Sequence, residues 1–131
     1  MSSYTLSRIG IIFIWLYHGL VPKLLFRDPT ELALVELGPT LHSAETTVLI
    51  AGAIEVVLGL VVLIYWSQRW PVWLSVLLFT ALLIGGVALK PSGAVEAFNP
   101  VTLSGSAILF GLINLRESSV CGRTKHDSVQ R

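Results

Sequence analysis

The stretch Trp15-Leu-Tyr-His-Gly-Leu-Val-Pro-Lys-Leu24 decides how the rest of the chain is interpreted. It places His18, Pro22 and Lys23 inside an apolar run that otherwise has the length and composition of a membrane-spanning helix. A charged or titratable group inside a bilayer costs roughly 2.5 to 3.5 kcal/mol, so such groups usually face other helices or a cavity. The same holds for Glu55 in the next apolar run. The functional candidates therefore concentrate at one place.

The composition is that of a small membrane protein. The chain has 131 residues, of which 53% are hydrophobic and 13% are charged, and its mean hydropathy is +0.75. A soluble domain of this size would carry more charge. The net charge of +1 offers no basic patch for nucleic acid, and the single cysteine, Cys121, has no partner for an internal disulfide.

Four apolar segments predict an all-α, membrane-embedded four-helix bundle, because lipid cannot hydrogen-bond the backbone of open strands. They cover about residues 6–26, 45–66, 72–89 and 97–115. The last is short for a span, and it starts at Asn99, an expected N-cap, with Pro100 at the first helical position. The membrane domain then covers residues 1–116, and residues 117–131 form a polar tail whose last dozen residues we expect to be disordered.

The one long connection contains its own helix signal. Asp28-Pro-Thr-Glu31 has the pattern of a capping box with proline at the first helical position, and Gly38-Pro39 supplies a stop. We predict a short interfacial helix at about residues 29–37, lying over the mouth of the bundle. Ser43 is the expected N-cap of the second span.

The basic residues predict the orientation. With four spans, both termini lie on one side, which carries six basic residues against three on the other. The six are Arg8, Arg69, Arg116, Arg123, Lys125 and Arg131, and the three are Lys23, Arg27 and Lys90. The positive-inside rule therefore favours cytoplasmic termini.

His18 and Glu55 are expected to meet inside the bundle. At 1.5 Å per residue, His18 lies about 18 Å along the first span and Glu55 about 15 Å from the outer end of the second, so both are near mid-depth. A hydrogen bond between them would offset much of the cost of burial. Pro22 has no N–H for the carbonyl of residue 18, which predicts a kink and a free acceptor nearby. Small residues around Glu55 indicate helix packing on that face.

Two interpretations of this polar spot remain open. His18 and Glu55 are either a structural clamp between two helices or the proton-handling groups of a substrate or quinone site. In the second case Trp15 and Tyr17 can stack on a flat ring. Metal or haem ligation is not expected, because it asks for further ligands at suitable spacing. Hydrolase, thiol-redox, zinc-protease and nucleotide signatures are missing.

Three further polar residues are expected at the outer mouth. Lys23 either snorkels to the interface or pairs with Glu31 or Glu96 as an electrostatic lid. Asn99 caps a helix whose N-terminal end attracts anionic groups. The acid-base candidates are thus His18 and Glu55, and the binding candidates are Trp15, Tyr17, Pro22, Lys23, Glu31 and Asn99.

These motifs resemble the DoxX-like family of small four-helix membrane proteins. The resemblance rests on Trp15-Leu-Tyr-His-Gly-Leu-Val-Pro-Lys-Leu24, on Glu55-Val-Val-Leu-Gly-Leu60 and on Phe98-Asn-Pro100, and it spans about residues 5–115. It implies a four-helix bundle in the cytoplasmic, or inner, membrane. The family's namesake is a membrane subunit of a quinone-reducing thiosulfate oxidoreductase. The resemblance thus implies a quinone as the candidate ligand, with a soluble oxidoreductase, membrane lipid or a second copy of the chain as candidate partners.

Three function hypotheses follow. The first is a membrane subunit or anchor that holds a lipophilic molecule between the first, second and fourth spans. The second is a non-catalytic scaffold, and the third is a stand-alone acid-base enzyme acting on a hydrophobic substrate. A pocket of roughly 300 Å³ or more beside His18 favours the first and third, whereas dry packing there favours the scaffold.

Overall fold

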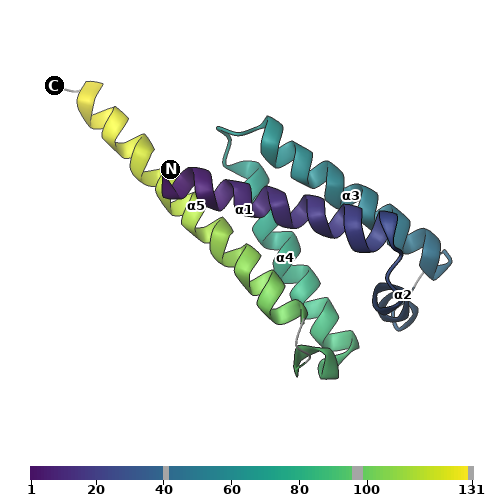
Figure 1. Ribbon diagram of the computed structural model, residues 1–131. Helices are drawn as coiled ribbons and strands as arrows, with labels where there is room; N and C mark the ends of the chain where they lie inside the picture. The colour runs from purple at the N-terminus through teal and green to yellow at the C-terminus, as the bar shows by residue number, and fades with distance from the viewer. Residues whose placement is uncertain (40–41, 96–98, 130–131) are drawn as a thin grey trace.

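The computed structural model describes residues 1–39, 42–95 and 99–129, with the backbone alone for residue 100 and residues 119–129. Within these ranges the chain is helical and contains no strand, which confirms the predicted all-α fold (Figure 1). The elements in chain order are α1 Ser3–His18, η1 Gly19–Leu25, α2 Pro29–Glu36, α3 Ala44–Ile64, α4 Trp70–Leu89, η2 Pro91–Val95 and α5 Pro100–Val129.

The predicted helix starts are confirmed by their caps. In each case a side-chain oxygen accepts one of the backbone N–H groups that a helix leaves unpaired in its first turn. The pairs are Asp28 with Thr30 at 2.7 Å, Ser43 with Thr46 at 3.3 Å and Asn99 with Thr102 at 2.8 Å.

The helices form two arms. One arm consists of α1, its continuation η1, and α3, while the other consists of α4 and α5. Because α1 also packs along α5, whereas α3 touches α4 only slightly, the arms are joined through α1 and α5. Figure 1 shows them close together near the N-terminus and diverging toward the end that carries α2 and η2. The short helix α2 packs against α3 at the open end, as the predicted interfacial helix should.

The hydrophobic core lies where the arms meet. Trp15 is 1% exposed, stacks on Phe79 with ring centroids 4.0 Å apart, and donates from Nε1 to the Ser75 hydroxyl at 2.9 Å. Ile11 and Val72, both fully buried, extend this contact toward the closed end. A buried indole with its N–H paired combines a large apolar area with no unsatisfied donor. Trp15 therefore holds α1 against α4.

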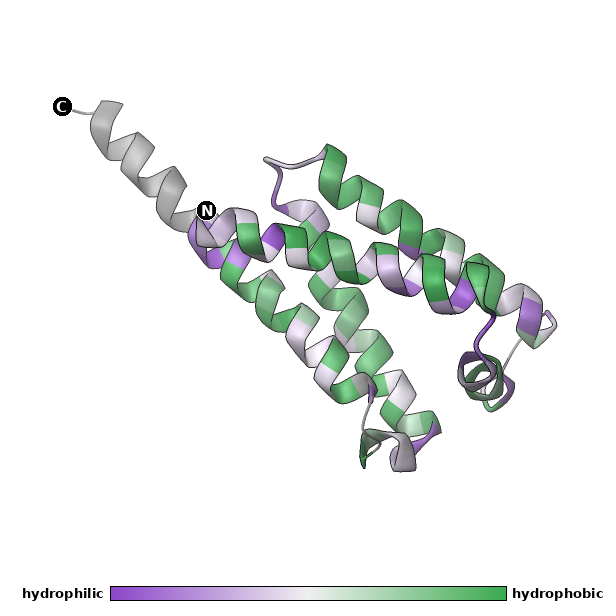
Figure 2. Cartoon of the chain, in the orientation of Figure 1, coloured by the Kyte–Doolittle hydropathy of each residue, from purple (hydrophilic) through white to green (hydrophobic). Residues whose placement is uncertain are grey.

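The outer faces of the helices are apolar (Figure 2). Three helical stretches, Ser3–Leu25, Ala44–Ile64 and Trp70–Leu89, are long and apolar enough to cross a membrane. At most 39% of any of these spans is buried inside the protein, so most of their hydrophobic surface needs lipid. The protein is an integral membrane protein.

The fourth apolar segment belongs to α5, which packs along α1 and α4 and completes the bundle. Residues 97 and 98 of this apolar segment lie outside the described residues, and the helix begins at Pro100, the first helical position predicted from the sequence. Its C-terminal part differs from the expectation, because α5 continues to Val129 through the segment for which we expected disorder. No proline interrupts residues 116–129, and a single glycine, Gly122, is not enough to break a helix.

The distortion predicted at Pro22 takes the form of a π-helix. Over Gly19–Leu25 carbonyls accept from the amide five residues later, as in the 3.0 Å bond from the Phe26 N–H to the Val21 carbonyl. In this pattern the carbonyl of residue 18 accepts from the N–H of Lys23, five residues later. It does not need a donor at Pro22, which has no N–H. The prediction of a free carbonyl at residue 18 is therefore wrong.

Candidate functional site

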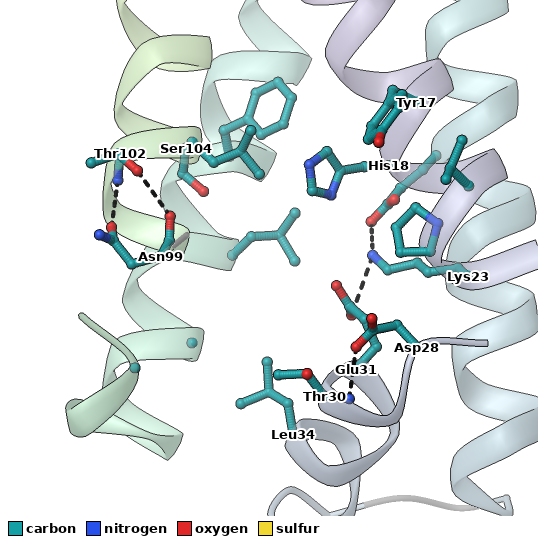
Figure 3. Close-up of a pocket in the computed structure, with 18 of the residues that line it drawn as sticks. Tyr17, His18, Lys23, Asp28, Thr30, Glu31, Leu34, Asn99, Thr102 and Ser104 are labelled. Atoms are coloured by element: carbon teal, nitrogen blue, oxygen red, sulfur yellow. Dashed lines mark hydrogen bonds and ion pairs between the residues drawn. The ribbon is translucent and has the colours of Figure 1, made fainter. Parts of the chain in front are cut away.

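A pocket of about 910 Å³ lies between the two arms, at their diverging end (Figure 3). It brings together all eight residues singled out from the sequence, which are Trp15, Tyr17, His18, Pro22, Lys23, Glu31, Glu55 and Asn99. Its volume lies within the range of roughly 300 to 1,000 Å³ typical of small-molecule sites. This is the open space that the two ligand-binding hypotheses require, rather than the dry packing expected of a scaffold.

The charged centre of the pocket is the Lys23 cluster, which consists of Lys23, Glu31 and Glu55. The Lys23 ammonium makes an ion pair with the Glu55 carboxylate and lies 3.8 Å from a Glu31 oxygen. Its side chain is only 9% exposed, so the interpretation that Lys23 snorkels to the interface is wrong. The predicted pairing with Glu31 is confirmed, whereas Glu96, the other partner considered, lies outside the described residues.

Close backbone contact between η1 and α3 places Lys23 beside Glu55. A Cβ atom added to Gly52 would lie 2.8 Å from the Gly19 carbonyl oxygen, and one added to Gly19 would lie 2.6 Å from that of Gly52. Only hydrogen atoms fit at such a crossing. The small residues around Glu55 therefore mark a helix contact, as the sequence predicted.

The predicted hydrogen bond between His18 and Glu55 is replaced by another. Glu55 accepts from Lys23 through Oε1, and its Oε2 has no hydrogen-bond partner in the part of the chain that the structure describes. A charge-assisted bond from an ammonium is stronger than one from a neutral imidazole, which explains the preference. His18 still lines the same pocket, where it is half-buried, so a ligand can lie between the two groups.

The two aromatic candidates differ in how much of each ring is available. Tyr17 is 48% exposed and already stacks on Phe13, with centroids 5.6 Å apart. Trp15 forms part of the pocket floor with Phe79, which covers one face of its indole. The labelled residues in Figure 3 place Tyr17 and His18 on the wall formed by α1. Because Trp15 and Phe79 cover each other and are almost fully buried, Tyr17 has more of its ring exposed.

The opposite wall comes from the first turns of α5, where the labelled side chains of Asn99, Thr102 and Ser104 lie across the pocket from His18 (Figure 3). Thr102 donates its hydroxyl proton to the Asn99 carbonyl at 3.2 Å, and Ser106 donates to the Thr102 carbonyl at 2.7 Å. Asn99 caps the helix, as described above. The sequence predicted Asn99 at the mouth, and the hydroxyls of Thr102 and Ser106 bond only to nearby carbonyls at the start of α5.

The pocket is slightly acidic. Its described charged residues are three acids, Asp28, Glu31 and Glu55, and two bases, Lys23 and Lys90, so the formal sum is 2 − 3 = −1 with His18 neutral. Hydrogen bonds from the Thr30 side chain and N–H lower the pKa of Asp28, which lies outside the spans. Among the residues that the structure describes, no three His, Cys, Asp or Glu side chains are grouped so as to hold a metal ion.

Sequence reasoning missed a second polar centre, the Arg8 cluster, at the closed end of the bundle. Arg8 is fully buried and donates to the Tyr4 hydroxyl at 2.8 Å, to Asn114 Oδ1 at 3.3 Å, and to the carbonyls of Tyr65 and Gln68 at 2.8 and 2.7 Å. From the sequence, Arg8 was only one of the basic residues that predicted the orientation. The available signal was Asn114, a lone amide in an apolar run, which is also fully buried.

The Arg8 cluster ties three elements together. The two carbonyls belong to the segment that follows α3, while Asn114 belongs to α5 and also donates from Nδ2 to the Tyr4 carbonyl at 2.8 Å. The carbonyls at a helix end carry partial negative charge, which suits a guanidinium. Arg8 thus fixes α1 against α5 and the α3–α4 connection.

Comparison with known proteins places these features in a family. No curated protein and no solved structure matches the chain. The DoxX-like family model matches residues 12–112, which is more than half of the chain. The matched range contains the Lys23 cluster, His18 and Asn99, and it excludes Arg8. The chain is a member of the DoxX-like family.

Proposed function

We propose that this protein is a membrane subunit or anchor that holds a lipophilic small molecule, with a quinone as the candidate ligand, in the pocket between its arms. One observation carries the proposal: a cavity of about 910 Å³ in a membrane bundle joins an apolar floor to a buried cluster of ionisable side chains. Such a site suits a molecule with an apolar body and a polar head. Buried charges in a membrane domain are functional candidates by default.

The proposed binding mode follows the division of the pocket. The apolar body lies over Trp15 and Phe79, and the head lies between His18 and the Lys23 cluster. In this mode His18 and Glu55 exchange protons with the head of the ligand rather than with each other, because Glu55 accepts its hydrogen bond from Lys23 instead of from His18.

The proposed location is the inner membrane, with both termini in the cytoplasm and α2 on the outer surface. Two of the basic residues used to predict the orientation, Arg8 and Lys23, are buried and drop out of the count. The remaining numbers are 6 − 1 = 5 against 3 − 1 = 2, so the bias that supports cytoplasmic termini persists. A soluble oxidoreductase would then reach the protein from either surface, and a second copy would pack against it within the membrane.

Quinone binding can be measured through the fluorescence of Trp15, since this side chain forms part of the pocket floor. Decylubiquinone is titrated into the protein in lipid nanodiscs, with empty nanodiscs correcting for partition into lipid. We expect saturable quenching that disappears in Trp15→Phe. In His18→Ala, loss of one hydrogen bond should weaken binding about tenfold without lowering the melting temperature.

The matched control is His42→Ala, which removes an exposed histidine outside the pocket and should bind as the wild type does. Glu55→Ala should also lose binding, whereas Glu55→Gln should keep the fold. If His18→Ala and Glu55→Ala both purify, melt and bind like the wild type, the proposed site is wrong. Mass spectrometry of the purified protein then shows whether any lipophilic molecule accompanies it.

A further inference from the structure

The Glu55 carboxylate is only half paired. Oε1 accepts from Lys23, while Oε2 is buried and has no hydrogen-bond partner among the described residues. The Glu55 side chain is 8% exposed, and the residue lines the pocket. A buried acceptor is normally paired with a donor from the protein, from water or from a ligand. Glu55 therefore leaves one acceptor unpaired at the pocket wall.

The neighbouring donors have other partners. Lys23 is shared between Glu55 and Glu31, so its charge is already balanced by two carboxylates. On the facing wall, Thr102 and Ser106 donate their hydroxyl protons to backbone carbonyls of α5. The described charges of the pocket also sum to −1, as shown above. The unpaired Glu55 oxygen is therefore left for a donor on the ligand, and the net charge of the pocket does not favour an anion.

We infer that the pocket selects lipophilic molecules whose head donates a hydrogen bond, such as a phenol or the reduced quinol form of a quinone, over those whose head only accepts one, such as the oxidised quinone, or carries negative charge. This inference rests on the proposed function and names the chemical class of its ligand. The hydroxyl group of the ligand donates a hydrogen bond to Glu55 Oε2, and its oxygen accepts a hydrogen bond from His18. A carboxylate head would instead meet Glu55 and Glu31 as like charges, with Lys23 already shared between them.

The second buried polar atom without a partner in the described chain has a different setting. It is Nε of Arg8, a donor in the closed Arg8 cluster, and Arg8 does not line this pocket. The other guanidinium nitrogens make four hydrogen bonds to protein atoms. Of the two residues with an unpaired buried atom, Glu55 is thus the one that lines this cavity.

Three probes that share one apolar body test the inference. 2-Naphthol donates a hydrogen bond, 2-methoxynaphthalene only accepts one, and 2-naphthoate is an anion. Each is titrated into the full-length protein in uncharged phosphatidylcholine nanodiscs by calorimetry, and empty nanodiscs are subtracted. We expect 2-naphthol to bind about tenfold more tightly than 2-methoxynaphthalene, and 2-naphthoate to bind more weakly than both.

Glu55→Gln tests whether the preference for 2-naphthol depends on the carboxylate of Glu55 or only on the shape of the site. Lys23 should keep the amide oxygen as its acceptor, which turns the amide nitrogen, a donor, toward the position of Oε2. The tenfold preference for 2-naphthol should then fall below threefold or reverse. Glu45→Gln is the matched control, because Glu45 pairs with Arg27 on the exposed surface away from the pocket, and it should retain the full preference.

The outcomes are distinguishable. Equal saturable binding of 2-naphthol and 2-methoxynaphthalene to the wild type would overturn the donor preference while leaving pocket binding intact. A preference that survives unchanged in Glu55→Gln would remove Glu55 from the explanation and overturn the inference. If none of the three probes, nor decylubiquinone, binds more than empty nanodiscs do, the proposed function itself fails.

Discussion

Two charged side chains of the first span, Arg8 and Lys23, are both buried, yet they are held in opposite ways. Arg8 donates four hydrogen bonds to a hydroxyl, an amide oxygen and two carbonyls, and has no carboxylate partner within the ion-pair distance among the described residues. Lys23 lies between two carboxylates at the wall of a large pocket. In both places these partners offset the free-energy cost of burying a charge in a membrane protein.

The difference lies in what surrounds each charge. Around Arg8 the protein itself supplies most of the partners, so the Arg8 cluster locks α1, α5 and the segment after α3 into one unit. Around Lys23 one carboxylate oxygen of Glu55 has no partner among the described residues, and Glu55 lines a large pocket. A buried charge whose hydrogen bonds are nearly all made to the protein indicates a structural role. A buried charge beside a cavity and an unpaired polar atom indicates a ligand-binding site.

The largest effect is expected at the Arg8 cluster. Arg8→Ala leaves the Gln68 carbonyl and the Asn114 oxygen without their donor and removes one of the two donors to the Tyr65 carbonyl, and each unsatisfied buried group costs about 1 to 3 kcal/mol. We expect the free energy of unfolding to fall by about 3 to 5 kcal/mol, measured by denaturation in mixed detergent micelles. Arg116→Ala, at an exposed position, should change it by less than about 0.5 kcal/mol. Equal losses in the two variants would contradict the comparison.

Glu55→Ala should destabilise the protein less than Arg8→Ala does. It leaves the buried Lys23 with Glu31 alone, and because the pocket admits water we expect a loss of about 2 to 3 kcal/mol. Glu45→Ala, which breaks an exposed pair with Arg27, should cost about 0 to 1 kcal/mol in the same assay.

The double variant Lys23→Met with Glu55→Leu sharpens this test. Apolar residues often replace a buried ion pair without loss of stability, so the double variant should unfold close to the wild type while losing the binding of 2-naphthol. If it kept that binding, the Lys23 cluster would be a structural clamp and no more.

The glycine contact between η1 and α3 predicts a smaller change. Gly52→Ala places a Cβ 2.8 Å from the Gly19 carbonyl oxygen, and relieving this overlap should cost about 1 to 3 kcal/mol and weaken probe binding. The control is Gly105→Ala in α5, where a Cβ meets nothing within 4 Å. It should leave binding unchanged and stabilise the helix by up to about 1 kcal/mol. Similar losses in both would show that the crossing does not depend on close approach.

The smallest effect concerns the cap of α2. The pKa of Asp28 is lowered in the folded protein, so its stabilising contribution is present above the ordinary value of 3.8 and is lost as the pH falls through the lowered value. Hydrogen exchange of α2 should accelerate below about pH 4, and Asp28→Ala should cost about 0.5 to 1 kcal/mol locally. Asp28→Asn keeps the cap and should remove the pH dependence. A dependence that persists in Asp28→Asn would assign it to another group.

Much of this architecture follows from local sequence. Long apolar runs, with Ser43 and Asn99 as caps, are enough to predict the helices within a few residues, because these signals act over a single turn. Matched depth on antiparallel spans was enough to bring His18 and Glu55 to one pocket. The depth of a residue in a span and the cap of a helix depend only on residue type and position along the chain, so both can be predicted from the sequence.

The sequence did not predict the direction in which each side chain points around its helix axis. The π-helical turn adds a residue per turn ahead of Lys23, which alters the direction of every later side chain and turns Lys23 toward Glu55. Arg8 was missed for a related reason, since its partners are backbone carbonyls after α3 and an amide 106 residues away. Neither set of contacts follows from periodicity or composition.

The ammonium of Lys23 connects the interior of the bilayer with its surface. One of its carboxylates belongs to a spanning helix and the other to the short helix α2. A single positive charge divided between two anions cannot move toward one without loosening its hold on the other. In the proposed binding mode, a ligand that bonds to Glu55 therefore also changes how strongly Lys23 holds the helix α2.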